Sequence, residues 1–208
     1  MTVTGQDEDI KQFFLYIKSG DNLFDFSNLI PVPEYIKLPE DVDGIPTFIS
    51  DAAELLMIRS GQKVIDFRGQ QKQERDIVNY GHKIIWKDEH FEYLIRCCKA
   101  IQQCSFSNRL PWKVYNWGTK CEAFSIEQKD NQIEFETAWN TPLPIWHKIA
   151  EMFPTLSIKI LYADENYGTN CGVIKIRKGF VEQEEINTVE FSYKVWDLSK
   201  EEIDQLVL

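Results

Sequence analysis

The chain of 208 residues carries 33 acidic and 23 basic side chains, which gives a net charge of −10 at pH 7. Hydrophobic residues make up 43% and charged residues 27% of the sequence, a balance that provides a packed core and excludes a wholly disordered chain. The acidic surplus repels phosphate backbones, so we expect no generic DNA or RNA binding. The same surplus suits docking on a basic protein surface, although it also serves simply to keep a protein soluble.

The sequence contains no membrane or secretory pattern. No stretch approaches the roughly 20 apolar residues that span a bilayer, and residues 1–9 are polar and acidic rather than basic and apolar. The five cysteines include no C-x-x-C pair, so we expect reduced thiols and neither a metal site nor a cofactor. We therefore expect a cytoplasmic protein with no membrane contact.

The first elements along the chain are a short strand at residues 2–5 and a helix. Ile10, Phe13 and Ile17 recur at helical spacing, and Gly20 ends that pattern. The closely spaced Pro31 and Pro33 then predict an extended connector.

Residues 48–105 show a helical pattern. Asp51 followed three residues later by Glu54 predicts a helix N-cap with a reciprocal partner, and Gly61 predicts the end of that helix. A weaker helix is expected over residues 74–86. An apolar stripe over residues 91–101 predicts a stronger helix that begins near Asp88.

After Pro111 the apolar period changes to two, which indicates strands. Alternation predicts a hairpin over residues 124–139 and further strands over 156–162, 173–176 and 189–195. A helix is expected from Pro142 to Phe153, because proline suits the first helical position. Ser199 and Glu202 have the spacing of a capping box for a short last helix.

Without the helical segment, the order of elements is β-α-β-β-α-β, as in ferredoxin-like folds. We therefore expect an α+β protein with an antiparallel sheet of four to six strands and the helices 7–19 and 142–153 on one face. The chain is expected to form one domain, 1–208, with its core in 1–20 and 115–180. Residues 48–105 form a helical insertion and residues 181–208 an extra C-terminal strand and a short helix.

Three segments carry a family resemblance: residues 115–120 (YNWGTK), 135–142 (FETAWNTP) and 162–168 (YADENYG). Together they resemble the YubB-like family of ferredoxin-like domains, which plasmids, phages and other mobile elements encode. The resemblance implies a ferredoxin-like fold and a mobile-element setting, but no established activity. Family members usually carry Trp where this chain has Cys121, a difference that weakens any ligand platform needing that aromatic ring.

Aromatic residues cluster with a lysine in these segments, and the cluster has two interpretations. It forms either a pocket for an anionic or planar ligand, or a packed loop in which glycine takes a special backbone angle and tryptophan fills the sheet edge. The candidate ligand or partner residues are Trp117, Gly118, Thr119, Lys120, Trp139, Tyr162 and Glu165.

No motif in the sequence specifies a reaction. There is no phosphate loop, G-x-S-x-G, Cys-His signature or dinucleotide fingerprint. His147 and Glu151 stand four residues apart on a predicted helix, but nothing indicates a third metal ligand. The leading hypothesis is a non-enzymatic interaction module of a mobile element, in which an acidic surface inhibits a nucleic-acid-handling protein. The alternative is a small-ligand-binding protein or enzyme with a site around residues 117–120.

Overall fold

The computed structural model describes residues 1–37, 47–77 and 87–206, and the chain divides into two compact units. Residues Met1–Ile30 and Trp117–Leu208 form one unit, which we call the sheet unit. Residues Pro31–Asn116 form the other, which we call the inserted unit and which contains the helical segment expected at 48–105.

All described strands belong to a six-stranded sheet in the sheet unit, in the order β2-β3-β1-β4-β5-β6, with every neighbouring pair antiparallel. The elements of this unit are β1 (Thr2–Thr4), α1 (Asp7–Ile17), α2 (Phe26–Leu29), β2 (Phe124–Lys129), β3 (Gln132–Glu136), α6 (Leu143–Met152), β4 (Ser157–Tyr162), β5 (Gly172–Arg177), β6 (Phe180–Glu185), α7 (Val189–Val195) and α8 (Lys200–Leu206). Strands β1 to β4, with α1 and α6 between them, have the order of a ferredoxin-like fold. Strands β5 and β6 extend that sheet beyond β4. The expected α+β fold is confirmed.

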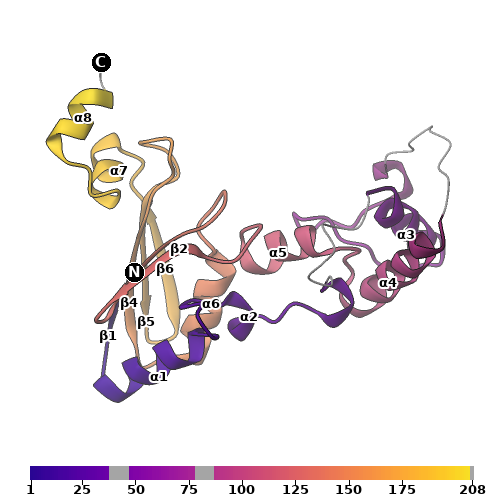
Figure 1. Cartoon of the computed structure of the whole chain (residues 1–208), viewed down its shortest axis with the longest axis horizontal. Helices are drawn as coiled ribbons and strands as arrows, with labels where there is room; N and C mark the ends of the chain where they lie inside the picture. Colours follow the sequence, from indigo (N-terminus) through magenta and orange to yellow (C-terminus); the bar gives the residue numbers. More distant parts are fainter. Residues whose placement is uncertain (38–46, 78–86, 207–208) are drawn as a thin grey trace. The chain divides into compact units, whose positions relative to one another are not determined.

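One face of the sheet is buried beneath α1 and α6 (Figure 1). Alternating strand residues, among them Val3, Ile158 and Ile174, supply its apolar side chains and are almost fully buried. Phe13 of α1 meets Phe153 at the end of α6 edge to face, with ring centroids 5.1 Å apart. This packing places both predicted helices on the same face of the sheet.

The inserted unit is helical and has its own core. Its elements are η1 (Glu34–Ile36), α3 (Thr47–Arg59), η2 (Glu74–Asp76), α4 (Asp88–Cys104) and α5 (Arg109–Trp117), whose last residue belongs to the sheet unit. The buried side chains of Ala53 and Met57 from α3 pack with Cys97 and Ile101 from α4. The helix ends predicted at Gly61 and near Asp88 are confirmed.

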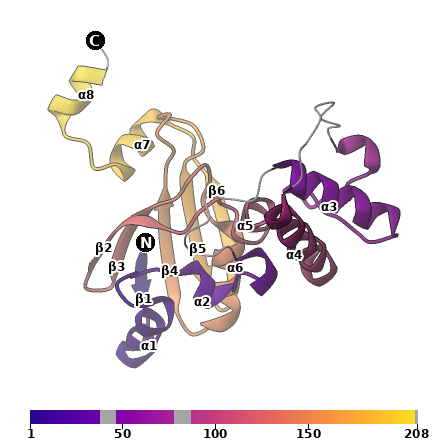
Figure 2. The same ribbon diagram turned by 45° about the vertical axis from the view of Figure 1, so that its right-hand side comes forward.

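The strand predicted over residues 189–195 is wrong, because this segment is helix α7, at one end of the sheet (Figure 2). Thr188 caps the helix by accepting a hydrogen bond from the Phe191 N–H at 3.3 Å. Ser192, which strand alternation would place on the wet face, is fully buried and accepts the Gly168 N–H at 2.9 Å. A buried, hydrogen-bonded serine thus lies where strand alternation predicted a solvent-facing side chain.

Three predicted boundaries in or near the inserted unit also differ. Helix α3 begins at Thr47, so Asp51 lies inside it and is no N-cap. Of the weak helix expected over 74–86, the structure forms the short turn η2, and residues 78–86 lie outside the described ones. Helix α5 extends to Trp117, through part of the segment treated as a loop.

Candidate functional site

Trp117 is fully buried where α5 enters the sheet unit. Its indole N–H donates a hydrogen bond of 2.9 Å to the carbonyl of Ile30. Its ring also meets that of Phe26 edge to face, with centroids 5.7 Å apart. These contacts satisfy the polar tip and cover the ring, so Trp117 stabilises the fold and presents no surface to a ligand.

The next two residues pack against the start of α6 and the loop before it. Gly118 has φ +83°, and a Cβ atom there would lie 2.9 Å from Pro144 Cδ and 3.2 Å from the Leu143 nitrogen. Only glycine fits this close approach without strain. Thr119 is also fully buried, and its hydroxyl donates to the Ala138 carbonyl at 2.7 Å. Residues 117–119 are therefore packed against other parts of the sheet unit.

Lys120 and Trp139 are the members of the predicted set that face solvent together. The Lys120 ammonium lies 4.6 Å from the centroid of the Trp139 ring, within the range of a cation–π interaction. Trp139 is 57% exposed. The ring therefore has one face under a cation and a large apolar area in water.

The backbone of Trp139 is held in an unfavourable conformation. Its φ is +76°, a region that bulky side chains rarely adopt and that costs about 1 to 3 kcal/mol. The flanking loop carries several hydrogen bonds: Thr119 to the Ala138 carbonyl, Thr137 to the Asn140 carbonyl at 2.9 Å, and the Asn170 amide to the Trp139 carbonyl at 3.4 Å. We call the Lys120–Trp139 pair and these supporting bonds the Trp139 knuckle. Sequence periodicity did not predict the positive φ of Trp139 or the hydrogen bond from Asn170.

Tyr162 and Glu165, the remaining predicted residues, lie outside the knuckle. The Tyr162 hydroxyl accepts a hydrogen bond of 2.8 Å from Gln183 of β6. It passes beside Gly172 of the intervening strand, where a Cβ atom would lie 3.0 Å from that hydroxyl. Glu165 is exposed. Within the described residues, no hydrogen bond or ion pair joins Glu165 to Lys120.

The inserted unit contains a buried charge network that the sequence pattern did not predict. Glu54 is 4% exposed, and its carboxylate accepts hydrogen bonds from the Lys72 ammonium and from the Ser107 hydroxyl, the latter at 2.5 Å. Burial, and then the nearby Glu54 charge, raise the pKa of Asp51. Within the described residues, no buried side-chain nitrogen or oxygen lacks a hydrogen-bond partner, which is typical of a structural cluster.

Burial keeps the Cys97 thiol protonated, and the expected partner of His147 is paired with another residue. All five cysteines are free, and burial raises the pKa of the Cys97 thiol to about 12, so it stays protonated at neutral pH. Glu151, the proposed partner of His147, instead pairs with Lys148 at 2.9 Å. Among the residues that the structure describes, no group of three potential metal ligands occurs.

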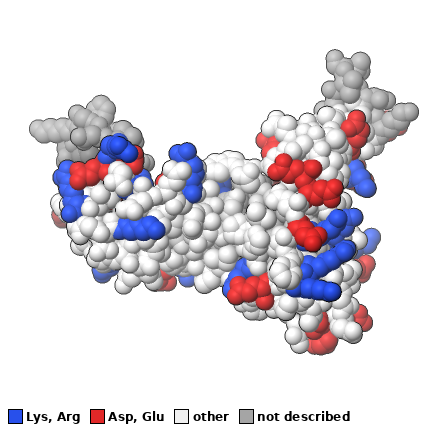
Figure 3. Space-filling view, turned by 180° about the vertical axis from the view of Figure 1, so that it is seen from behind, with Lys and Arg blue, Asp and Glu red and all other residues white. Residues whose placement is uncertain are grey.

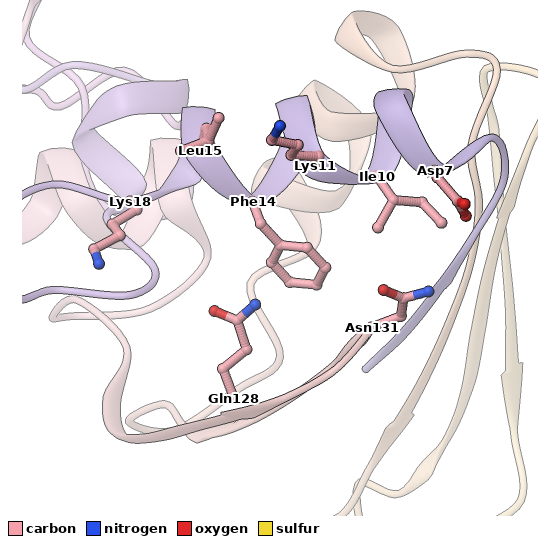
Figure 4. Close-up of a pocket in the computed structure, with 8 residues that line it drawn as sticks. All are labelled: Asp7, Ile10, Lys11, Phe14, Leu15, Lys18, Gln128 and Asn131. Atoms are coloured by element: carbon pink, nitrogen blue, oxygen red, sulfur yellow. The ribbon is translucent and has the colours of Figure 1, made fainter.

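A groove of about 410 Å³ lies between α1 and the β2–β3 hairpin, away from the knuckle. Ile10 and Phe14 point from α1 toward Asn131 and Gln128 (Figure 4). Its charged lining residues, Asp7, Lys11 and Lys18, all come from α1 and its C-terminal end.

Residues 116–205 match the family described as the ferredoxin-like domain in Api92-like protein. This match agrees with the ferredoxin-like order of the sheet and covers most of the sheet unit, including the whole knuckle. No curated protein and no solved structure matches the chain.

The match supports the ferredoxin-like part of the predicted resemblance and does not address the YubB-like assignment or a mobile-element setting. Among the described helices, none combines the length and the apolar character that a bilayer crossing requires.

Proposed function

We propose that this chain is a non-enzymatic protein-interaction module, and that the Trp139 knuckle is the anchor of its interface. The observation that carries the proposal is an exposed tryptophan at a strained φ, in a loop that several hydrogen bonds support. Backbone strain persists where the surroundings impose it and concentrates at functional positions. Tryptophan is also the residue type most enriched among the energetic anchors of protein interfaces.

The charge distribution supports a basic protein as the partner. The inserted unit has 12 acidic and 12 basic residues and is neutral, whereas the sheet unit has 21 acidic against 11 basic residues. The sheet unit therefore holds the whole net charge of −10. Such a concentrated charge speeds association with a basic surface and favours basic partners over acidic ones.

The same negative charge supports a nucleic-acid-binding protein as the partner. Proteins that bind nucleic acids present basic surfaces, which an acidic module can cover in place of the phosphate backbone. We therefore propose inhibition of a host or competitor nucleic-acid-handling protein. We also propose that the chain is related to the YubB-like family and is encoded on a mobile element.

A small-ligand site on residues 117–120 has less support. Trp117 and Thr119 are fully buried and hydrogen-bonded within the protein, so they have neither surface nor free polar groups to offer. Lys120 is engaged with the Trp139 ring. A ligand in this position would need to displace core packing.

Affinity capture with the full chain tests the proposal. We expect the wild-type chain to retain basic proteins from a cell lysate at low salt and to release them as ionic strength rises. Trp139→Ala should lose this capture, because the anchor ring is gone. The matched control is Phe180→Ala, which removes a 73% exposed ring from β6 of the same unit.

Equal capture by the wild-type chain and Trp139→Ala would contradict the anchor role. Recovery of a small molecule bound to the purified chain, with no protein partner, would instead support the ligand-binding alternative.

A further inference from the structure

The second face of the sheet, opposite α1 and α6, contains a hollow of about 260 Å³. Strands β1, β4 and β5 line it with Thr2, Thr4, Ser157, Ile158, Lys159, Lys175 and Arg177. On β4 and β5 the apolar residues Ile158, Ile160 and Ile174 face the buried side. Strand alternation therefore sends Lys159 and Lys175 to the open face.

The lining of this hollow is basic in a unit that is strongly acidic. It includes three cations and no carboxylate, whereas the unit as a whole carries 21 acidic against 11 basic residues. Figure 3 shows Lys and Arg side chains gathered on the part of the molecule that carries the sheet. A local reversal of charge of this kind attracts anions to one place.

Two of the cations oppose each other directly. Lys159 and Lys175 are register partners on the adjacent strands β4 and β5, and like charges in this relation destabilise a sheet. Lys175 has partial compensation from Glu184, 3.8 Å away, and its register partner on β6 is Glu182. Within the described residues, neither Lys159 nor Arg177 has an ion-pair partner. A bound anion would relieve this repulsion.

Hydroxyl groups complete the set of donors. The Thr4 hydroxyl donates to the Ser157 carbonyl at 2.9 Å, which fixes the edge of the hollow. The hydroxyls of Thr2 and Ser157 make no hydrogen bond to the described part of the chain, so both can donate to an anion. Two hydroxyls beside three cations suit a compact oxyanion that accepts from several directions at once.

We propose that this hollow binds a phosphate group, either as free inorganic phosphate or at the end of a small phosphorylated molecule. The site is independent of the Trp139 knuckle, which lies on other elements. A phosphate dianion would sit between Lys159, Lys175 and Arg177 and accept charge-assisted hydrogen bonds from them.

Titration of the full chain with inorganic phosphate, followed by amide chemical shifts at constant ionic strength, tests the site. We expect saturable shifts on β1, β4 and β5, and Lys159→Gln should weaken binding at least tenfold. Lys11→Gln, which removes the same charge from α1 on the covered side of the sheet, is the matched control and should bind as the wild type does. Because it removes a repulsion, Lys159→Gln should fold and melt no lower than the wild type, so a loss of binding cannot be ascribed to unfolding.

A second titration with adenosine monophosphate, with adenosine as its control, distinguishes the two sources of phosphate. Tighter binding of the monophosphate than of phosphate supports a phosphorylated small molecule, and equal binding supports the free ion. Two results would overturn the proposal: the same shifts with chloride as with phosphate, or equal weakening by Lys11→Gln and Lys159→Gln. Trp139→Ala should leave phosphate binding unchanged, which separates this test from that of the proposed interface.

Discussion

The indole N–H of Trp117 donates to the carbonyl of Ile30, 87 residues earlier in the chain, at 2.9 Å. These two residues are the points at which the chain leaves the sheet unit and returns to it. The hydrogen bond therefore joins the two residues that flank the inserted unit in the sequence. Closure entropy rises by only about 0.6 kcal/mol for each doubling of loop length, so a well-packed junction offsets part of the cost of this long insertion.

Trp117→Ala should destabilise the sheet unit by about 3 to 5 kcal/mol, the usual cost of removing a buried aromatic side chain. Trp117→Phe keeps much of the ring but leaves the Ile30 carbonyl without its donor, so we expect about 1 to 3 kcal/mol. Lys120→Ala, the neighbouring control, should cost at most about 1 kcal/mol, because its side chain is exposed. Urea unfolding followed by circular dichroism measures all three, and a large loss in Lys120→Ala would contradict this division of roles.

Trp139→Gly and Trp139→Ala should separate backbone strain from side-chain contacts. Both variants lose the ring and its cation–π contact, but glycine adopts φ +76° without strain whereas alanine does not. We therefore expect the glycine variant to be more stable by about 1 kcal/mol. Thermal unfolding of the two proteins gives the difference. Equal stability would show that the backbone at residue 139 is unstrained in solution.

Lys72→Met should destabilise the inserted unit, because it leaves the Glu54 carboxylate buried without its cation. We expect roughly 2 to 3 kcal/mol, below the value for a fully buried pair, since the Lys72 side chain is 22% exposed. Arg59→Met is the control: it breaks an ion pair with Glu74 at 3.1 Å in which both side chains are at least half exposed. That change should cost under about 1 kcal/mol.

A double-mutant cycle checks the origin of this effect. In a Glu54→Gln background the buried charge is absent, so Lys72→Met should have a much smaller effect on the free energy of unfolding. The same cost in both backgrounds would mean that Lys72 acts through packing of its aliphatic stem.

The Cys97 thiol should make the stability of the protein fall at high pH. Burial raises the pKa of this group from 9.0 to about 12 in the folded protein, so between these values the unfolded chain has lost a proton that the folded chain keeps. The free energy of unfolding therefore decreases as pH rises from 9 toward 12, by up to about 1.4 kcal/mol per pH unit from this group. Denaturant unfolding at several pH values should show a shallower decrease for Cys97→Ala. Parallel curves for the two proteins would exclude a contribution from Cys97.

The sequence by itself determined those parts of the fold that depend on local patterns. Alternation of apolar residues predicted the strands of the ferredoxin-like core, because side chains of a strand point to opposite faces. The capping box of Ser199 and Glu202 is confirmed: the Ser199 N–H donates to the Glu202 carboxylate at 2.8 Å, and the Glu202 N–H donates to the Ser199 hydroxyl at 3.3 Å. Such features involve residues within one turn or one strand, so neighbouring letters are sufficient to specify them.

Only the tertiary structure decided what each candidate residue does. Residues 189–195 alternate like a strand but form a helix, in which the buried Ser192 hydroxyl accepts a hydrogen bond from Gly168 on a separate loop. Trp117 and Trp139 are the same residue type in neighbouring motifs, yet one is fully buried and the other is 57% exposed. The burial of Trp117 and the positive φ of Trp139 depend on contacts with other segments of the chain. The pairing of Lys159 with Lys175 likewise depends on how β4 and β5 align. Periodicity reports which side of an element a residue faces, whereas the partner on that side is set by the packing of the whole unit.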